Sequence, residues 1–425
     1  MALTFGSFLL LMLAGAPMVF VLGVAGALTL ALSDATPLVV VAQRLYNGLD
    51  SFTLLAIPFF VLAGLIMERG GIARAIVGLA GAMVGWIRGS LFMVATVTGT
   101  GLAAISGSGS ADTAAVSSIL IPEMKRRGYD IDYAAAAIAA AGALGPIIPP
   151  SIIMVVLAMI SDLSVGAMFL GGLVPGLLAA AGLMAANWVF ARRDPARYAD
   201  AEPFSLPRLG QALRHALPAL TLPVIIVGGI VGGVVTPTEA AVLAVAVALL
   251  VSLLVYREMR LADLPAIMLR AAGLSSAVMI IIGTASIFSW LIAVQDVPAM
   301  ISGWFAQNVG AAWVFLLVVN LLLLVVGMFM ESISAILILM PVLMPVAVHL
   351  GIDPLHFGVV VAINLSIGLI TPPYGICLFV AGTVAGRSVT QVSSKVWLPL
   401  IPMLLMLLLA TYLPDIVLWL PRAVF

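Results

Sequence analysis

Long, predominantly apolar stretches constrain this 425-residue chain more than any other feature of its sequence. The clearest of them are 217–236, 239–255, 274–295, 312–330 and 398–413. A helix of about 20 apolar residues crosses the hydrocarbon core of a bilayer. Only helices and closed barrels satisfy their backbone hydrogen bonds in lipid, and these stretches lack the apolar–polar alternation of barrel strands. The sequence therefore predicts an all-α polytopic membrane protein, embedded in a lipid bilayer.

The composition excludes several other classes of protein. Only 8% of the residues are charged, against about a quarter in ordinary soluble domains. The formal net charge is zero, so we expect no nucleic-acid partner. The single cysteine, Cys377, excludes an internal disulfide and a cysteine-based metal cluster. The three histidines are far apart, and none has a carboxylate at metal-ligand spacing.

The chain contains an internal duplication, because one offset of 223 residues (351 − 128 = 223) aligns its two halves. The aligned pairs are Gly128 with Gly351, Asp130 with Asp353, Gly145 with Gly368, and Pro149–Pro150 with Pro372–Pro373. The longest polar stretch, 191–215, lies between the halves. We therefore predict a first repeat at 1–190, a cytoplasmic linker at 191–215 and a second repeat at 216–425.

The distribution of basic residues predicts that the two repeats have opposite orientations in the membrane. The linker 191–215 carries five arginines, which place it in the cytoplasm. The corner 125–127 is also basic, whereas its equivalent at 349–353 has no lysine or arginine. The loop 33–36 has none either, whereas the region 223 residues later carries two arginines. Charge thus changes sides between the copies, as inverted-topology repeats require.

Two segments, 88–125 and 311–349, are predicted to form re-entrant hairpins. Each has a polar centre, at 105–110 and at 328–334, between two apolar arms that are short for a full crossing. Two short helices joined by a polar tip would enter and leave the membrane on one side. Such tips are tolerated at membrane depth only where they face protein or a water-filled cavity.

A proline-broken helix follows each hairpin, at 131–160 and at 354–383. The breaks contain Pro149–Pro150 and Pro372–Pro373. Two successive prolines remove two backbone donors and cannot continue a helix, so the carbonyl oxygens that precede them are left free.

Hydroxyl and carbonyl oxygens at these breaks are ligands for a hard cation, and sodium is the expected ion. Helix N-termini at the same place favour an anionic substrate group. Paired discontinuous helices in two inverted halves are typical of a secondary transporter's binding site. The first predicted sodium site comprises Ser106, Ser108, Gly145, Ile148 and Pro150, the last three mainly through their carbonyls. The second comprises Glu331, Ser332, Ser334, Gly368, Thr371 and Pro373. Ser110, Asp112 and Thr113 are assigned to substrate contact or to the support of the ion ligands.

Other interpretations of these polar residues stay open. Small residues also line helix–helix contacts in membranes. Asp112 could lie in the first turn of the second arm, where the backbone amides would stabilise it. Glu331 could bind the ion, support its ligands or take up a proton.

Five stretches together resemble the large membrane subunit of tripartite ATP-independent periplasmic (TRAP) transporters, the DctM-type family, over nearly the whole chain. They are ISGSGSADTAAVSSILIPEM at 105–124, GALGPIIPPS at 142–151, TPTEAA at 236–241, FMESISAILILMP at 329–341 and GLITPPYG at 368–375. The resemblance implies an elevator-type, sodium-coupled importer of organic acids, such as sialic acid or C4-dicarboxylates, in a bacterial inner membrane. It implies two or more sodium ions, at sites that match the two hairpin tips and the broken helices, and no organic cofactor.

The resemblance also implies partners and a topology. The expected partners are a small four-helix membrane subunit, separate because the large-subunit pattern begins at the start of this chain, and a periplasmic substrate-binding protein. The segment 3–14 becomes a short first crossing, although the residues alone equally allow one kinked helix at 3–32. The expected total is about ten crossings and two hairpins.

Two other functions were compared with this one. The first is a stand-alone sodium–dicarboxylate or citrate symporter of similar architecture. The second is an intramembrane hydrolase that uses Ser108 or Asp112. A serine enzyme needs a base within hydrogen-bond reach, and His349 belongs to the opposite hairpin. Only Glu331 could pair with Asp112, so we do not expect an enzyme.

Overall fold

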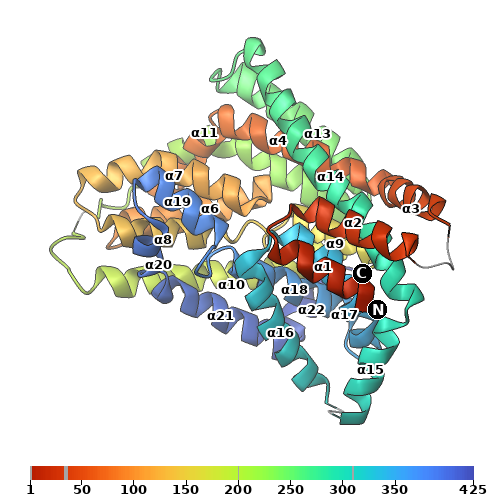
Figure 1. Cartoon of the computed structure of the whole chain (residues 1–425). Coiled ribbons are helices and arrows are strands. Elements are labelled where there is room, and N and C mark those ends of the chain that lie inside the picture. Colours follow the sequence, from red (N-terminus) through yellow and green to blue (C-terminus); the bar gives the residue numbers. More distant parts are fainter. Residues whose placement is uncertain (1, 33–36, 200, 309–310) are drawn as a thin grey trace.

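The computed structural model describes residues 2–32, 37–199, 201–308 and 311–425, and its regular structure there is entirely helical (Figure 1). The loop 33–36, which the charge comparison used, lies outside these ranges. By length and composition, seven helical segments in the described ranges can cross a membrane, or eight with a pair bent by 62°. The prediction of an all-helical, multi-span membrane protein is thereby confirmed.

The first half contains ten α-helices and one 3₁₀ turn within the described ranges. They are α1 (Ala2–Leu13), α2 (Met18–Ala31), α3 (Val39–Leu49), η1 (Phe52–Leu55), α4 (Ala56–Arg69), α5 (Ile72–Val84), α6 (Ser90–Ser106), α7 (Gly109–Arg126), α8 (Ile131–Gly142), α9 (Ile152–Ile160) and α10 (Val165–Ala191). The segments α1 and α2 are separate helices, as the resemblance implied.

The second half contains longer helices and several short irregular turns. They are α11 (Leu206–Pro223), η2 (Val224–Gly228), α12 (Gly229–Val231), α13 (Pro237–Leu250), η3 (Val251–Val255), η4 (Leu261–Asp263), α14 (Leu264–Val294), α15 (Val297–Asn308), α16 (Ala312–Phe329), α17 (Ser332–His349), α18 (Pro354–Gly368), α19 (Ile376–Ala385), α20 (Val389–Ser393), α21 (Trp397–Tyr412) and α22 (Asp415–Val424).

The structure differs from the sequence-based boundaries in two places. Helix α11 begins at Leu206, inside the stretch predicted as linker, with Pro207 in its first turn where proline is well tolerated. The two hairpin breaks are only two residues long, at 107–108 and 330–331. The arms of the second hairpin therefore reach 18 residues each, so by length and composition each can cross a membrane and is not short for a crossing as predicted.

The helices pack into two groups that meet at the centre of the molecule. Helices α2, α3 and α4 pack on α14, and α4 also packs on α13. Figure 1 shows α6, α7, α8, α19 and α20 gathered on the other side, with α10 and α21 below them. The first arms of the broken helices form the core, because every residue from His356 to Gly368 is buried, as is every residue of α8 except Asp132.

Two of the four pairs aligned by the 223-residue offset mark the end of one helix and the start of the next. Gly128 and Gly351 have φ angles of +74° and +76°, which glycine adopts without strain. Asp130 Oδ1 accepts hydrogen bonds from the amides of Asp132 and Tyr133, both at 3.1 Å. Asp353 Oδ1 does the same for Leu355 and His356, at 2.9 and 3.1 Å. These positions therefore end each hairpin and cap the broken helix that follows.

Polar contacts bring loops from both halves to one end of the molecule. Arg387 pairs with Asp132 at 3.1 Å, and Lys395 with Asp130 at 3.9 Å. Arg197 Nε donates to the Gly128 carbonyl at 2.7 Å. The basic corner, the linker and the α19–α21 connection are consequently neighbours.

The cap at Asp353 predicts a selective loss of stability. Replacing it with alanine leaves two amides at the start of α18 without their acceptor, which costs about 1 kcal/mol. Asp353→Asn keeps an acceptor at the same place, so its midpoint of thermal unfolding in detergent should stay near that of the wild type. Equal losses in the alanine and asparagine variants would contradict the capping role.

Candidate functional site

The tip of the first hairpin is a two-residue turn whose shape requires glycine. Gly107 has a φ angle of +62°, which side-chain-bearing residues rarely adopt. A Cβ atom added to it would collide with the carbonyl oxygen of Pro150. The backbone of the hairpin tip therefore lies directly against the Pro-Pro break of the first broken helix.

Hydrogen bonds within the tip tie its two helices together. Ser106 Oγ donates to Asp112 Oδ1 at 2.5 Å and accepts from the Ser108 amide at 3.1 Å. Thr113 Oγ1 donates to the Gly109 carbonyl at 2.7 Å. Asp112 is 2% exposed, and its second oxygen, Oδ2, has no hydrogen-bond partner in the described part of the chain. A buried carboxylate oxygen without a partner is costly, so this position calls for a cation or a proton.

The first broken helix supplies further oxygens beside this carboxylate. A Cβ atom on Gly145 would lie 2.9 Å from the Gly109 nitrogen and 3.0 Å from Asp112 Oδ2. The side chain of Ile148 points instead toward Gly176 of α10. Within the described ranges, the carbonyl oxygens of Gly145, Ile148 and Pro150 accept no hydrogen bond. The structure thus brings Ser106, Ser108, Gly145 and Pro150 together, with carbonyl oxygens free to bind a cation.

The tip of the second hairpin is built differently. Glu331 occupies the position equivalent to Ser108 (331 − 108 = 223). Its Oε2 atom accepts from the amides of Ile333 and Ser334 at 3.0 and 3.2 Å, so Glu331 caps α17. The interpretations made from the sequence did not include this role, although an acidic residue just before a helix is a recognised capping signal. Ser332 and Ser334 are buried behind it.

The second broken helix contacts the second hairpin at α16, the first arm of that hairpin. A Cβ atom on Gly368 would lie 2.7 Å from the Gly327 Cα atom, so the two backbones are in contact. Thr371 Oγ1 donates back to the Ile367 carbonyl at 2.7 Å, and Pro373 is exposed. In the ranges that the structure describes, no hydrogen bond joins these residues to Glu331, Ser332 or Ser334. The second ligand set therefore remains a prediction of the sequence.

A cavity of about 110 Å³ lies between the two hairpin tips. The first tip contributes residues 107–110 and the second contributes residues 331–333. The remaining lining residues are Pro146, Ile152, Ile153, Leu369 and Ile376. Ser110 lines this cavity, whereas Asp112 and Thr113, which were assigned with it to substrate contact or support, do not. The apolar lining was missed, because nothing in a sequence separates such residues from ordinary core.

The protein's positive charge for a small anion in this cavity would have to come from backbone amides. None of its lining residues is a lysine, arginine or histidine. Ser108 begins α7 without a side-chain cap, so the first amides of that helix remain available to an anion. At the other tip, Glu331 already occupies the equivalent amides.

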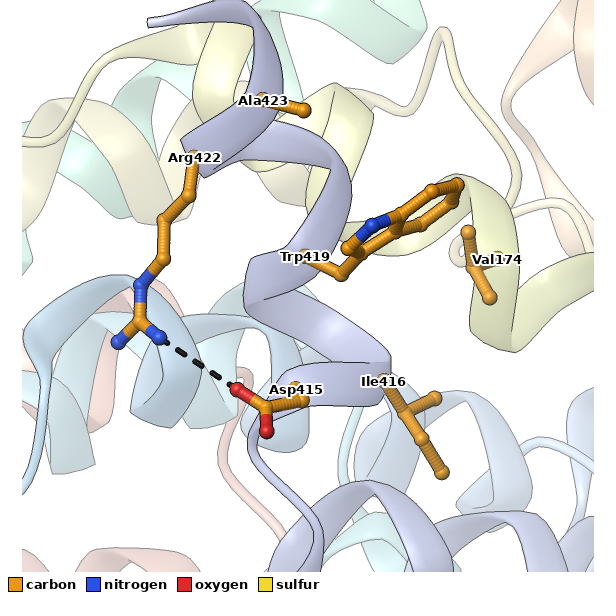
Figure 2. Close-up of a pocket in the computed structure, with 6 residues that line it drawn as sticks. All are labelled: Val174, Asp415, Ile416, Trp419, Arg422 and Ala423. Atoms are coloured by element: carbon orange, nitrogen blue, oxygen red, sulfur yellow. Dashed lines mark hydrogen bonds and ion pairs between the residues drawn. The ribbon is translucent and has the colours of Figure 1, made fainter.

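A larger hollow of about 640 Å³ lies elsewhere, beside the C-terminal helix α22 (Figure 2). The Trp419 ring extends from α22 toward Val174, and Asp415 pairs with Arg422 at 3.4 Å. No hairpin or broken-helix residue lines this hollow. It is therefore separate from the candidate site.

Substitution of Gly145 tests whether contact between the tip and the break forms an ion site. In Gly145→Ala the added methyl group would push against the hairpin backbone, so the stabilisation of the protein by sodium should disappear. The measurement is the sodium-dependent shift of the thermal unfolding midpoint. Gly273→Ala is the control, because a Cβ atom there meets no other atom within 4 Å. An unchanged sodium shift in Gly145→Ala would rule out this ion site.

The chain matches the family described as "Tripartite ATP-independent periplasmic transporter, DctM component" over residues 5–416. The C4-dicarboxylate TRAP transporter large permease protein DctM of Rhodobacter capsulatus is 38% identical over 98% of each chain. The isethionate TRAP transporter permease protein DctMQ of Oleidesulfovibrio alaskensis is 40% identical over 97% of this chain and 65% of its own length.

A solved structure has a similar fold at low sequence identity. The YdaH transporter of Alcanivorax borkumensis superposes with a TM-score of 0.66 and is 14% identical, over 95% of this chain and 97% of that one.

Proposed function

The chain belongs to the DctM component family of tripartite ATP-independent periplasmic transporters, and from this membership we propose that it imports an organic acid together with sodium. As a large permease of that family it is a transporter and not an enzyme. The family membership predicted from the sequence is therefore confirmed, and a hydrolase role for Ser108 or Asp112 is excluded. We propose in addition an organic-acid substrate, sodium as the coupling ion and an elevator mechanism.

The cavity between the two hairpin tips is the observation that carries this proposal. Substrate would bind there, with its acidic group at the free amides of α7 and its remainder against the apolar wall of Leu369 and Ile376. The relatives are named for a C4-dicarboxylate and for isethionate, both small acids. Because the lining includes no basic side chain, bound sodium would supply much of the positive charge.

The first sodium ion would bind beside Ser106 and the unpaired Asp112 oxygen, where the backbones of Gly145 and Pro150 approach the hairpin tip. The carbonyl of Ile148 is the remaining ligand assigned from the sequence. This assignment gives Asp112 a direct part at the ion, beyond the supporting role expected from the sequence. The second ion would take oxygens from Ser332, Ser334, Thr371 and the carbonyls around Gly368. Glu331 caps α17 through its Oε2 atom, and its Oε1 atom would support this ion.

An elevator mechanism with inverted repeats fits the arrangement of the two halves. The hairpin breaks at 107–108 and 330–331 are 223 residues apart, and so are the helix caps at Asp130 and Asp353. Ser366 donates to the Ala143 carbonyl, which is its own equivalent in the other half. A contact between equivalent positions is what a two-fold axis produces. The total of about ten crossings would include spans assembled from the shorter helices α1, α2 and the broken pairs.

The protein would work with partners in a bacterial inner membrane. A tripartite system implies partner subunits, and the isethionate relative carries the name DctMQ and is longer than this chain. We assign one partner as a small four-helix membrane subunit and the other as a periplasmic substrate-binding protein. The end at which the basic loops meet would face the cytoplasm.

Uptake into proteoliposomes tests the proposal directly. The chain and its small partner would be supplied with labelled organic acids, with or without the binding protein, under a sodium or a potassium gradient. We expect uptake only when sodium and the binding protein are both present. Sodium-driven uptake without the binding protein would instead indicate a stand-alone symporter, and uptake indifferent to sodium would refute the coupling.

Two variants examine the sodium sites separately. Ser106→Ala and Thr371→Ala should each raise the sodium concentration for half-maximal uptake by about tenfold, because each removes a hydroxyl ligand. Ser118→Ala and Thr383→Ala are matched controls, since these hydroxyls are exposed and bond only to their own helices. A normal sodium dependence in Thr371→Ala alone would remove the second site while leaving the first.

A further inference from the structure

Another cavity, separate from the one between the hairpin tips, lies where the first hairpin meets α5 and the polar strap 201–208. Its volume is about 360 Å³. Its walls come from α5, α6 and α7, and its rim comes from the end of α7 and from the strap. The lining residues used below are Gly78, Gly81, Ile119, Glu123, Arg126 and Arg208.

The inner part of this cavity is apolar and open. Gly78 and Gly81 of α5 and Gly85, which follows its last residue, recur at helical spacing and line it together. A Cβ atom on Gly78 or on Gly81 would have no neighbour within 4 Å, so no side chain of the protein fills this face. Opposite it stand Leu91 and Val94 of α6 with Ile119 and Leu120 of α7. Such a groove fits a hydrocarbon chain.

The rim of the cavity is positively charged. Arg126 and Arg127 pair with Glu123, and Arg208 pairs with Glu202. The hydrogen bond from Arg208 lowers the pKa of Glu202, which therefore stays ionised at neutral pH. Three guanidinium groups and two carboxylates leave one positive charge, and the side chains of Arg126 and Arg208 are 77% and 55% exposed. A guanidinium has five N–H donors, so each can also bind a phosphate oxygen.

Tryptophan and arginine side chains near the rim are typical of a membrane boundary. Trp86, just after α5, is 52% exposed and donates to the Met83 carbonyl at 2.9 Å. At the same end, Arg192 lies over the Trp188 ring at 3.7 Å. Tryptophans gather at the level of the lipid headgroups, and basic residues gather on the cytoplasmic side. The apolar groove therefore faces the acyl chains while its arginines face the headgroups.

We propose that this cavity binds one anionic phospholipid of the cytoplasmic leaflet. Its phosphate bonds to Arg126 and Arg208, and one acyl chain lies along the glycine face of α5. A free phosphate would leave the apolar wall unused, and a zwitterionic lipid would leave the net positive charge unbalanced. The lipid would join the base of the first hairpin to the strap that leads into α11. This inference rests on the membrane orientation proposed above and not on the transported substrate.

Native mass spectrometry of the delipidated, full-length chain tests this site without any transport assay. The probes are phosphatidylglycerol, phosphatidylcholine and inorganic phosphate, each added separately. We expect one phosphatidylglycerol to bind, and the double variant Arg126→Gln/Arg208→Gln to bind it at least about tenfold more weakly. Gly81→Leu should also weaken it, because the new side chain fills the groove and leaves the rim charge intact.

Controls separate this site from general membrane charge. Arg192→Gln removes a basic residue at the same end but outside the cavity, so its lipid binding should match the wild type. Size-exclusion profiles identify variants that fail to fold. If the double arginine variant fails to fold, lipid binding by Gly81→Leu tests the site instead. Wild-type binding in both variants, equal binding of phosphatidylcholine, or binding of phosphate with no preference for the lipid would each overturn the proposal. Because no uptake is measured, such a result would leave the proposed transport function standing.

Discussion

A helix that breaks inside a bilayer leaves backbone amides and carbonyls that hydrocarbon cannot satisfy. This requirement explains why the two breaks of the first half meet within the protein. The tip at Gly107 rests on the Pro150 carbonyl, and the glycine backbone of residue 145 rests on the start of α7. Free carbonyl oxygens would be prohibitive against lipid, but residues 143–150 of this break are buried within the protein.

The sequence predicts the positions of the breaks well, because glycine, serine and proline act on the backbone locally. Both hairpin turns lie inside the predicted polar centres, and the aligned pairs Gly128/Gly351 and Asp130/Asp353 prove to be a helix stop and a helix cap. The same local signals overestimated the length of each turn. Ser332, for example, belongs to a helix because Glu331 caps it, whereas composition alone made it part of the polar tip.

Other features of the site depend on contacts between distant segments and could not be predicted. The bond between Ser106 and Asp112 requires the left-handed turn at Gly107, which brings two positions six residues apart together. Leu369 and Ile376 line the cavity only because the second broken helix approaches the first hairpin. The ion pairs at the basic end show the same limit. Exposed pairs of this kind contribute little stability singly, and Arg387 finds Asp132 through the fold of both halves.

The hydrogen bond between Ser366 and Ala143 has a consequence for how such a chain could arise. In an ancestor of half the length, two antiparallel copies would place this position against itself, and both sides would carry the same residue. Once the two copies are joined in one gene, the two facing positions can carry different residues. The present chain has serine on one side and alanine on the other, so a single hydroxyl bridges the halves at Ala143. In the inverted-repeat arrangement proposed above, divergence at this one self-facing position would give the two halves an asymmetric bond.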